Sequence, residues 1–300
     1  MTAPRQILPG QFYLVTRRCT QRQFLLRPDE TTTQIFLFTL GEAAARFGVE
    51  LIAWHASSNH YHAVLYDPDG KLPLFLERFH KLCARALNAR WKRWENFWAA
   101  EATCAVRLIE DADVLDKVTY ALANPVADHL VDRVFDWPGA NSLRYTAAVP
   151  RTVTVARPKI FFREAGPLPQ SVTLVVDAPP AHRSDRGAWA ERVDAAIRDK
   201  EHAAREARLA TGARVAGRRR ILAASAFDKP TTHEPRGNLR PHIACLNRER
   251  RIRELMALRR FRAAHAEARR WFADGQRDVL FPAGTFQMRV RFGAPCAAPS

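Results

Sequence analysis

The segment Ser58-Asn59-His60-Tyr61-His62-Ala63-Val64-Leu65 carries the pattern that decides the fold. Its apolar and aromatic residues predict a β-strand, in which side chains two residues apart point to the same face. His60 and His62 would therefore share one face, and Tyr61 and Ala63 would point the other way. Two neutral imidazoles on one face of a rigid strand can hold a divalent metal ion if a third ligand comes from elsewhere in the chain. The alternative interpretation is a polar strand edge that carries two surface histidines.

The bulk composition is that of a globular protein. The chain has 300 residues, of which 47% are hydrophobic and 26% are charged, enough for one large domain or for a compact domain with an extension. Its five cysteines are scattered without paired spacing, which fits a reducing compartment and offers neither a disulfide framework nor a zinc knuckle. Signal-peptide and membrane-span patterns are missing, so we expect a soluble cytoplasmic protein with no membrane partner.

Positive charge is concentrated in the second half of the chain. The formal net charge is +16; residues 1–150 hold 17 basic and 16 acidic residues, whereas residues 151–300 hold 30 and 15. This asymmetry predicts a catalytic or structural domain followed by a region that binds a polyanion. Arginine supplies most of the charge, and its planar fork suits phosphate contacts. A GC-rich genome would explain part of the arginine content but not its accumulation downstream.

The first half has a regular order of predicted elements. Hydrophobic periodicity predicts strands and helices at 11–18 (strand), 31–47 (helix), 49–55 (strand), 60–66 (strand), 72–93 (helix), 103–109 (strand) and 111–123 (helix). The two strands flanking Ala56–Asn59 form an antiparallel hairpin in this interpretation. The order predicts an α+β domain over residues 10–146, a ferredoxin-like antiparallel sheet with helices on one face.

The second half, residues 151–300, is predicted to be a basic, mostly helical extension that binds DNA. Its predicted elements are a strand-like segment at 171–176, a charged helix at 188–209, a connector at 227–241, a long helix at 247–274 and a last strand-like piece at 287–292.

An aromatic and basic cluster ends the predicted helix at 72–93. It comprises Trp91, Trp94, Phe97 and Trp98, beside a basic helix side. Such a mixture can stack bases and pair with phosphates, although it can equally be a packed corner of the core. The basic residues that we expect to contact a polyanion such as DNA are Arg17, Arg18, Arg78, Lys81, Arg85, Arg218, Arg219 and Arg220.

Tyr120 and Asn124 are four residues apart, so a helix places them on one face. A tyrosine hydroxyl can attack a phosphodiester, and an amide oxygen can bind a hard metal ion. Pro125 should end or kink the helix. The alternatives are that Asn124 caps a new helix with Pro125 at its first position, and that Tyr120 is a core residue.

Taken together, these motifs resemble a known family. Asn59-His60-Tyr61-His62, followed by Tyr120-x-x-x-Asn124-Pro125-Val126, resembles the one-tyrosine HUH transposases, a group of single-strand transposases that includes insertion-sequence-200-like domains, and within them the REP-associated tyrosine transposases. The resemblance covers roughly residues 10–146. Two departures stand out: Ser57-Ser58 replaces the usual Met-Pro, and Pro138 follows Trp137 in reversed order.

The resemblance implies a metal-dependent single-stranded DNA endonuclease and strand transferase that acts on hairpin-bearing DNA in transposition. Tyr120 would be the nucleophile and form a 5′-phosphotyrosine, while His60, His62 and Asn124 would hold Mg²⁺ or Mn²⁺. The family also implies a nucleoid-associated location and a possible homodimer. Two other functions stay open. One is a domesticated DNA-binding protein that keeps the scaffold, and the other is a metal-dependent phosphoesterase that uses water as the nucleophile.

Overall fold

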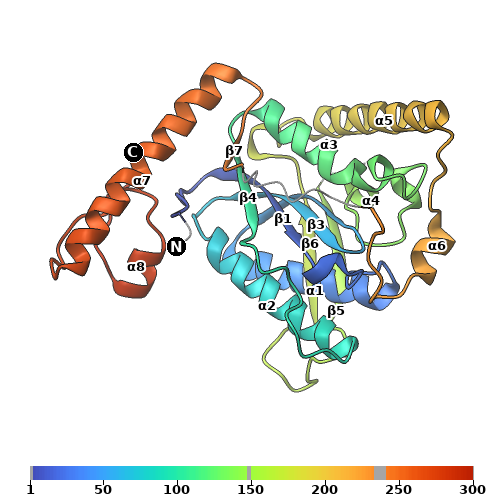
Figure 1. The fold of residues 1–300 in the computed structure, drawn as a ribbon, viewed down its shortest axis with the longest axis horizontal. Helices are drawn as coiled ribbons and strands as arrows, with labels where there is room; N and C mark the ends of the chain where they lie inside the picture. The colour runs from blue at the N-terminus through green and yellow to red at the C-terminus, as the bar shows by residue number, and fades with distance from the viewer. Residues whose placement is uncertain (1–2, 147–149, 233–240, 300) are drawn as a thin grey trace.

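The alternating side chains of strand β1 (Gln11–Arg18) divide between two hydrophobic cores. Tyr13 and Val15 point into one core, whereas Leu14 packs in the other with Phe12 at its edge. A strand that is apolar on both faces must be covered on both faces. In the computed structural model, helices therefore lie on both sides of the sheet (Figure 1).

The structure describes residues 3–146, 150–232 and 241–299, and all structural statements concern these residues. Their elements, in chain order, are β1, η1 (Thr20–Arg22), α1 (Glu30–Phe47), β2 (Glu50–Ala56), β3 (His60–Asp67), α2 (Leu72–Arg90), β4 (Cys104–Leu108), α3 (Asp111–Ala127), η2 (Val134–Asp136), α4 (Leu143–Thr146), β5 (Arg151–Ala156), β6 (Ser171–Val176), η3 (Pro180–His182), α5 (Arg186–Thr211), α6 (Arg218–Ala223), β7 (Ile243–Ala244), α7 (Arg248–Ala273) and α8 (Gln287–Phe292).

The sheet has seven strands in the order β5-β6-β2-β3-β1-β4-β7. The four strands of the first half pair antiparallel, and β2 and β3 form the predicted hairpin. The order of strands and helices predicted for this half is confirmed, and so is the α+β class. The sheet as a whole is mixed, because β6 runs parallel to β2 and β7 runs parallel to β4.

The prediction that all helices lie on one face is wrong. Helices α1 and α2 cover one face of the sheet and pack on the core that contains Val15, Tyr61 and Trp54. Helix α3 covers the other face of the sheet, on the core that contains Leu14 and Val64, and α5 packs against α3. The reason is that the strands carry apolar side chains at successive positions, so neither face can be left to solvent.

Helix α3 continues through Pro125 and ends at Ala127, so the prediction that the helix ends at Pro125 is wrong. Proline removes one backbone donor, but the neighbours of Pro125 are buried and hold the helix against the sheet. Leu130 and Val131 also donate their backbone N–H groups to the Pro125 carbonyl. Asn124 is therefore inside a helix, and the interpretation of it as an N-cap is wrong.

The second half contributes strands to the same sheet. The predicted strand at 171–176 is confirmed as β6, while β5 and the two-residue β7 were not expected. The piece at 287–292 is helix α8, so the prediction of a strand there is wrong. Its apolar residues alternate as in a strand, but Met288 and Phe292, one helical turn apart, contact the small core around Phe272, and these tertiary contacts override the local pattern. Most of the predicted connector 227–241, and residues 147–149 between the two predicted domains, lie outside the described residues.

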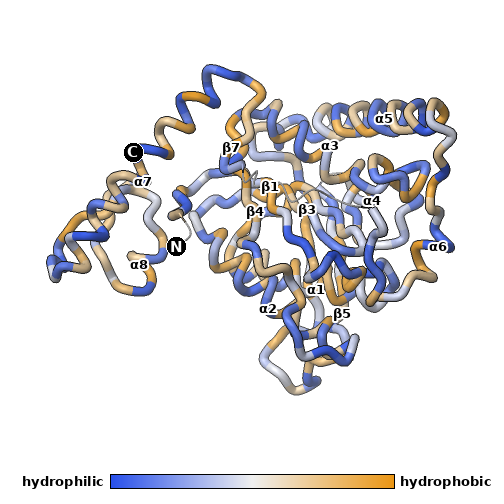
Figure 2. The backbone as a smooth tube through the Cα atoms, viewed as in Figure 1, coloured by the Kyte–Doolittle hydropathy of each residue, from blue (hydrophilic) through white to orange (hydrophobic). Residues whose placement is uncertain are grey.

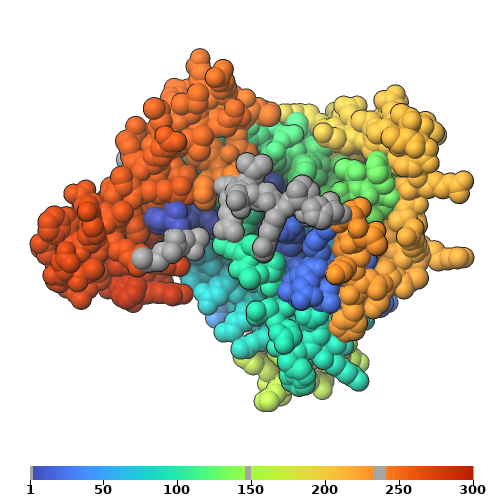
Figure 3. Space-filling model, viewed as in Figure 1, coloured from blue at the N-terminus to red at the C-terminus, as the bar shows by residue number. Residues whose placement is uncertain are grey.

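Helices α7 and α8 form a lobe beside the sheet (Figures 1 and 3). This lobe has a small core of its own around Ala268, Phe272 and Phe281. It is attached to the N-terminal segment, since the N–H of Ile7 donates to the carbonyl of Gly284 at 2.9 Å. Hydrophilic and hydrophobic residues alternate along helix α5, whose apolar side is buried (Figure 2). Among the described residues, no helix combines the length and the apolar composition that crossing a membrane requires.

Candidate functional site

Strand β3 and helix α3 bring the two histidines and the tyrosine together. His60 and His62 lie on the α3 side of β3, as their alternation with the core residues Tyr61 and Ala63 requires. Their ring centroids are 4.8 Å apart, and the ring of Tyr120 lies 5.1 Å from the ring of His62 in an edge-to-face arrangement. Residues 60 places apart in the sequence thus form one group of side chains.

Hydrogen bonds orient both imidazoles. Nδ1 of His62 lies 2.7 Å from Oγ1 of Thr16 on β1, and Nδ1 of His60 lies 2.8 Å from Oδ1 of Asn59. A partner at Nδ1 makes Nε2 the nitrogen through which each ring would bind a metal ion, an arrangement common in metal sites. Burial lowers the pKa of His62 well below its usual value, helped by His60 and then His55. His62 is therefore neutral, the form that binds metals.

Asn124 is held by a hydrogen bond that the sequence did not reveal. Its Oδ1 accepts from the hydroxyl of Ser57 at 2.7 Å, and Ser57 Oγ lies 2.8 Å from Nε2 of His55. All three side chains are buried. Ser57 thus links the turn before β3 to the amide of Asn124 on α3.

The backbone fixes the direction of this hydrogen-bond chain. Asn141 accepts from the N–H of Leu143 through Oδ1 and donates to the carbonyl of Leu122 through Nδ2. Nδ2 also lies 3.1 Å from Nδ1 of His55, so Nδ1 must accept and Nε2 of His55 must carry the proton. Nε2–H then donates to Ser57 Oγ, whose own hydrogen is directed to the amide oxygen on α3. A second lone pair on that oxygen suits a metal ion, so the donor set of two imidazoles and one amide fits a divalent cation.

Tyr120 is accessible to a substrate. Its side chain is 47% exposed, which excludes the interpretation of a core tyrosine. Lys117, one helical turn earlier, places its Nζ 5.9 Å from the centroid of the Tyr120 ring. The same ammonium is paired with the carboxylate of Asp116 at 2.8 Å, so its contact with the Tyr120 ring is of the cation–π type.

The residues expected to contact DNA are dispersed over the molecule. Arg18 on β1 pairs in register with His60. Arg78 makes a two-pronged ion pair with Glu42 at 2.7 and 2.9 Å, and this contact joins α2 to α1. Lys81 and Arg85 are exposed on α2, and Arg218, Arg219 and Arg220 are exposed on α6. Arg17 is partly buried on the opposite face of the sheet from His62.

The aromatic cluster after α2 is mostly a packed corner. Phe97 and Trp98 are buried, and Trp91 donates its ring N–H to the carbonyl of Leu25 at 3.0 Å. Trp94 differs because its side chain is 97% exposed. Packing therefore explains three of the four residues, and base stacking stays a prediction for Trp94 alone.

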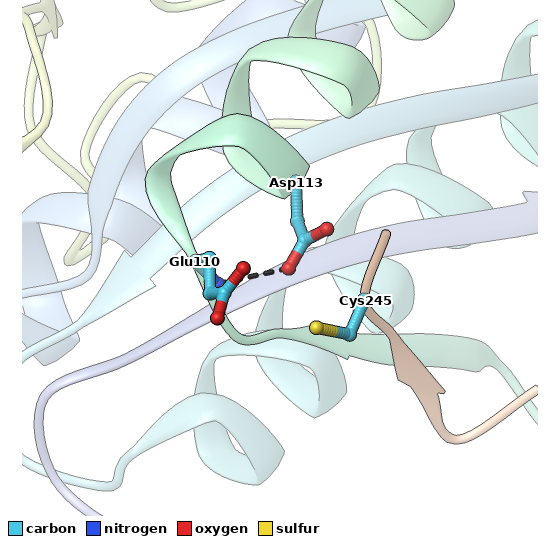
Figure 4. A group of neighbouring side chains, drawn as sticks. All are labelled: Glu110, Asp113 and Cys245. Atoms are coloured by element: carbon cyan, nitrogen blue, oxygen red, sulfur yellow. Dashed lines mark hydrogen bonds between the residues drawn. The ribbon is translucent and has the colours of Figure 1, made fainter. Parts of the chain in front are cut away.

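A second group with metal-ligand chemistry lies at the start of α3 (Figure 4). Possible ligand atoms of Glu110, Asp113 and Cys245 lie within 4.8 Å of one another. The carboxylate of Asp113 already accepts the N–H of Glu110 at 2.9 Å and the N–H of Leu246 at 2.6 Å. It begins the helix and anchors the segment after β7, so these contacts explain the group without a metal.

Comparison with known proteins gives limited likenesses. Neither a protein-family model nor a curated protein matches the chain. Among solved structures, a REP-associated tyrosine transposase bound to a REP hairpin is 19% identical with a TM-score of 0.42, over 50% of this chain and 86% of that one. A putative transposase from Deinococcus radiodurans R1 is 18% identical with a TM-score of 0.29, over 37% and 89% of the two chains. Both TM-scores are low, so neither likeness assigns a function.

Proposed function

We propose that the chain is a metal-dependent endonuclease and strand transferase for single-stranded, hairpin-bearing DNA, with Tyr120 as its nucleophile. One observation carries the proposal: an exposed tyrosine ring lies 5.1 Å from the inner imidazole of a strand-borne His-x-His pair. Phosphoryl transfer to a phenol requires the nucleophile to lie next to a group that polarises the phosphate, and the two imidazoles would hold a metal ion for that purpose beside the Tyr120 ring.

Each side chain has a distinct task in this reaction. The phenolic oxygen of Tyr120 forms a bond to phosphorus, the bond from phosphorus to the 3′-oxygen breaks, and that oxygen takes up a proton. The proton that the phenol loses passes to solvent, from which the 3′-oxygen takes its own. His60, His62 and Asn124 would hold Mg²⁺ or Mn²⁺, which supplies Lewis-acid polarisation of the phosphate when bound. The 5′-phosphotyrosine conserves the bond energy, so the 3′-hydroxyl of a second strand can reverse the step without ATP.

The test is formation of a covalent adduct. The protein is incubated with single-stranded hairpin DNA from the flanks of its own gene, with Mg²⁺ or Mn²⁺ or with a chelator, and analysed on a denaturing gel. We expect a metal-dependent adduct that Tyr120→Phe abolishes while hairpin affinity is retained. Tyr13→Phe is the matched control, because the hydroxyl of Tyr13 is buried in the opposite core without a hydrogen-bond partner among the described residues.

The other outcomes separate the alternatives. An adduct that persists in Tyr120→Phe would exclude Tyr120 as the nucleophile. Cleavage with turnover but without an adduct would indicate water as the nucleophile. Hairpin binding without cleavage under every metal condition would identify a DNA-binding protein that keeps the scaffold.

A further inference from the structure

A groove of ≈ 480 Å³ lies on the opposite face of the sheet from His60 and His62. Its walls come from α2, the end of β1 and the segment before β4, and its charged residues are Arg5, Arg17, Glu77 and Lys81. Because Thr16 supports His62 on one face, the next residue, Arg17, must point to the other. The groove and the Tyr120 site therefore lie at the same end of β1, on either side of the sheet.

Arg17 is fixed in the groove by neutral partners. Its Nη1 donates to Nδ1 of His80 at 2.8 Å and to Oγ1 of Thr103 at 2.9 Å. Since arginine can only donate, Nδ1 of His80 accepts, and Nε2 of His80 carries a proton that it donates to the hydroxyl of Tyr61 at 2.6 Å. Nε of Arg17 is buried without a partner among the described residues, and the guanidinium lies 5.5 Å from the ring of Trp98.

The groove holds an excess of partly desolvated positive charge. Arg5 donates to the carbonyl of Thr103 at 2.8 Å, which is again a neutral partner. Burial lowers the pKa of both Arg5 and Arg17. Within the described ranges, no carboxylate forms an ion pair with either guanidinium, and Glu77 is the one carboxylate among the residues that line the groove. Buried charge without a counter-ion is unfavourable, so an anionic ligand would stabilise this arrangement.

We propose that this groove is a second nucleic-acid contact, a subsite for backbone phosphates of the same single strand that reaches Tyr120. The inference rests on the proposed function and adds the path of the strand over the end of β1. Arg5, Arg17 and Lys81 bind the phosphates, and the indole of Trp98 forms an apolar side of the groove. Cations beside an aromatic wall are the usual features of a channel for single strands.

The experiment measures binding without cleavage. Fluorescence anisotropy of a labelled 15-nucleotide oligothymidine, and of the same oligothymidine annealed to oligoadenosine, is recorded in a chelator at several salt concentrations. We expect Lys81→Met to weaken single-strand binding about threefold, Arg17→Gln to weaken it about tenfold, and either to reduce the slope of log affinity against log salt by about 0.7 per lost phosphate contact. Glu77→Gln should strengthen binding about twofold.

Lys200→Met is the matched control, because Lys200 is an exposed lysine on α5, a helix with six basic and five acidic residues. The affinity of Lys200→Met for the oligonucleotide should stay within about 1.5-fold of the wild type, since loss of one exposed charge away from the groove is largely screened by salt. Arg17→Gln can affect folding, so the exposed positions Lys81 and Glu77 decide the outcome.

Unchanged affinity and salt slope in both Lys81→Met and Glu77→Gln would overturn the proposal, and so would an effect confined to the duplex probe. These results are independent of the chemistry at Tyr120. If no adduct forms but the groove variants change binding as expected, the proposed function fails and the subsite stands. If wild type and Lys81→Met both form the adduct and bind the oligonucleotide with equal affinity, the subsite fails and the proposed function stands.

Discussion

Substitution of Ser57 by alanine tests the hydrogen-bond chain that holds Asn124. The hydroxyl of Ser57 accepts from His55 and donates to Asn124, over 2.8 and 2.7 Å. Ser57→Ala leaves a buried N–H without an acceptor and a buried amide oxygen without a donor. Each unsatisfied buried group costs roughly 1–3 kcal/mol, so we expect the free energy of unfolding to fall by about 3 kcal/mol.

Urea unfolding followed by circular dichroism measures this change. Ser58→Ala is the control, because it removes a hydroxyl from the neighbouring residue, which is only partly buried and contributes its backbone carbonyl to Leu26. We expect the control to change stability by less than about 0.5 kcal/mol. A Ser57→Ala variant as stable as the control would refute the reasoning, because it would show that the three side chains are not bonded to one another.

The same substitution should also lower the rate of adduct formation. Loss of groups that orient a metal ligand typically costs about 10–100-fold in metal affinity or activity, so we expect a loss of at least about tenfold under subsaturating metal. The double variant Ser57→Ala/Asn124→Ala should be no slower than Asn124→Ala alone, because Ser57 acts through Asn124. Additive losses would contradict that dependence.

Two further predictions concern stability. Three buried histidines have pKa values lowered by desolvation: His55, His62 and His80. Below pH about 6.5 these histidines bind protons in the unfolded chain but not in the folded chain. The free energy of unfolding should therefore be constant above that pH and fall by up to about 4 kcal/mol per pH unit below it. Urea midpoints between pH 7.5 and 5.5 measure this dependence, and a midpoint that does not change with pH would contradict it. Gly139→Ala should cost about 2 kcal/mol because its Cβ would lie 2.4 Å from Cβ of Pro28, whereas Gly187→Ala on α5 meets no atom closer than 3.8 Å; equal thermal stability of the two variants would refute the clash.

Local sequence patterns were sufficient for the parts of the site that lie within one element. A strand period of two places His60 and His62 on one face, and a helical period of about 3.6 residues places Tyr120 and Asn124, four residues apart, on one face. These periods depend only on backbone geometry, which is why both pairs could be predicted. The pattern also located the strands and helices of the first half.

Contacts between distant segments could not be predicted from those periods. The sequence shows neither that Ser57 bonds to Asn124, 67 residues later, nor that β6 pairs with β2 through Leu51 and Val176. Helix α3 crosses Pro125 because its neighbours are buried against the sheet, which overrides the local preference of proline. Such features depend on which surfaces meet when the whole chain packs.

The sequence by itself therefore determined which chemical groups are available: two imidazoles, an amide and a phenol. It also determined which of them share a face of one strand or one helix. The tertiary structure decided that α3 covers the histidine face, which brings the Tyr120 ring to 5.1 Å from His62. It also decided that Arg17 enters a groove on the other face with neutral partners only. The physical reason is that a local period sets the direction of a side chain, whereas its neighbours are set by the burial of both faces of the sheet.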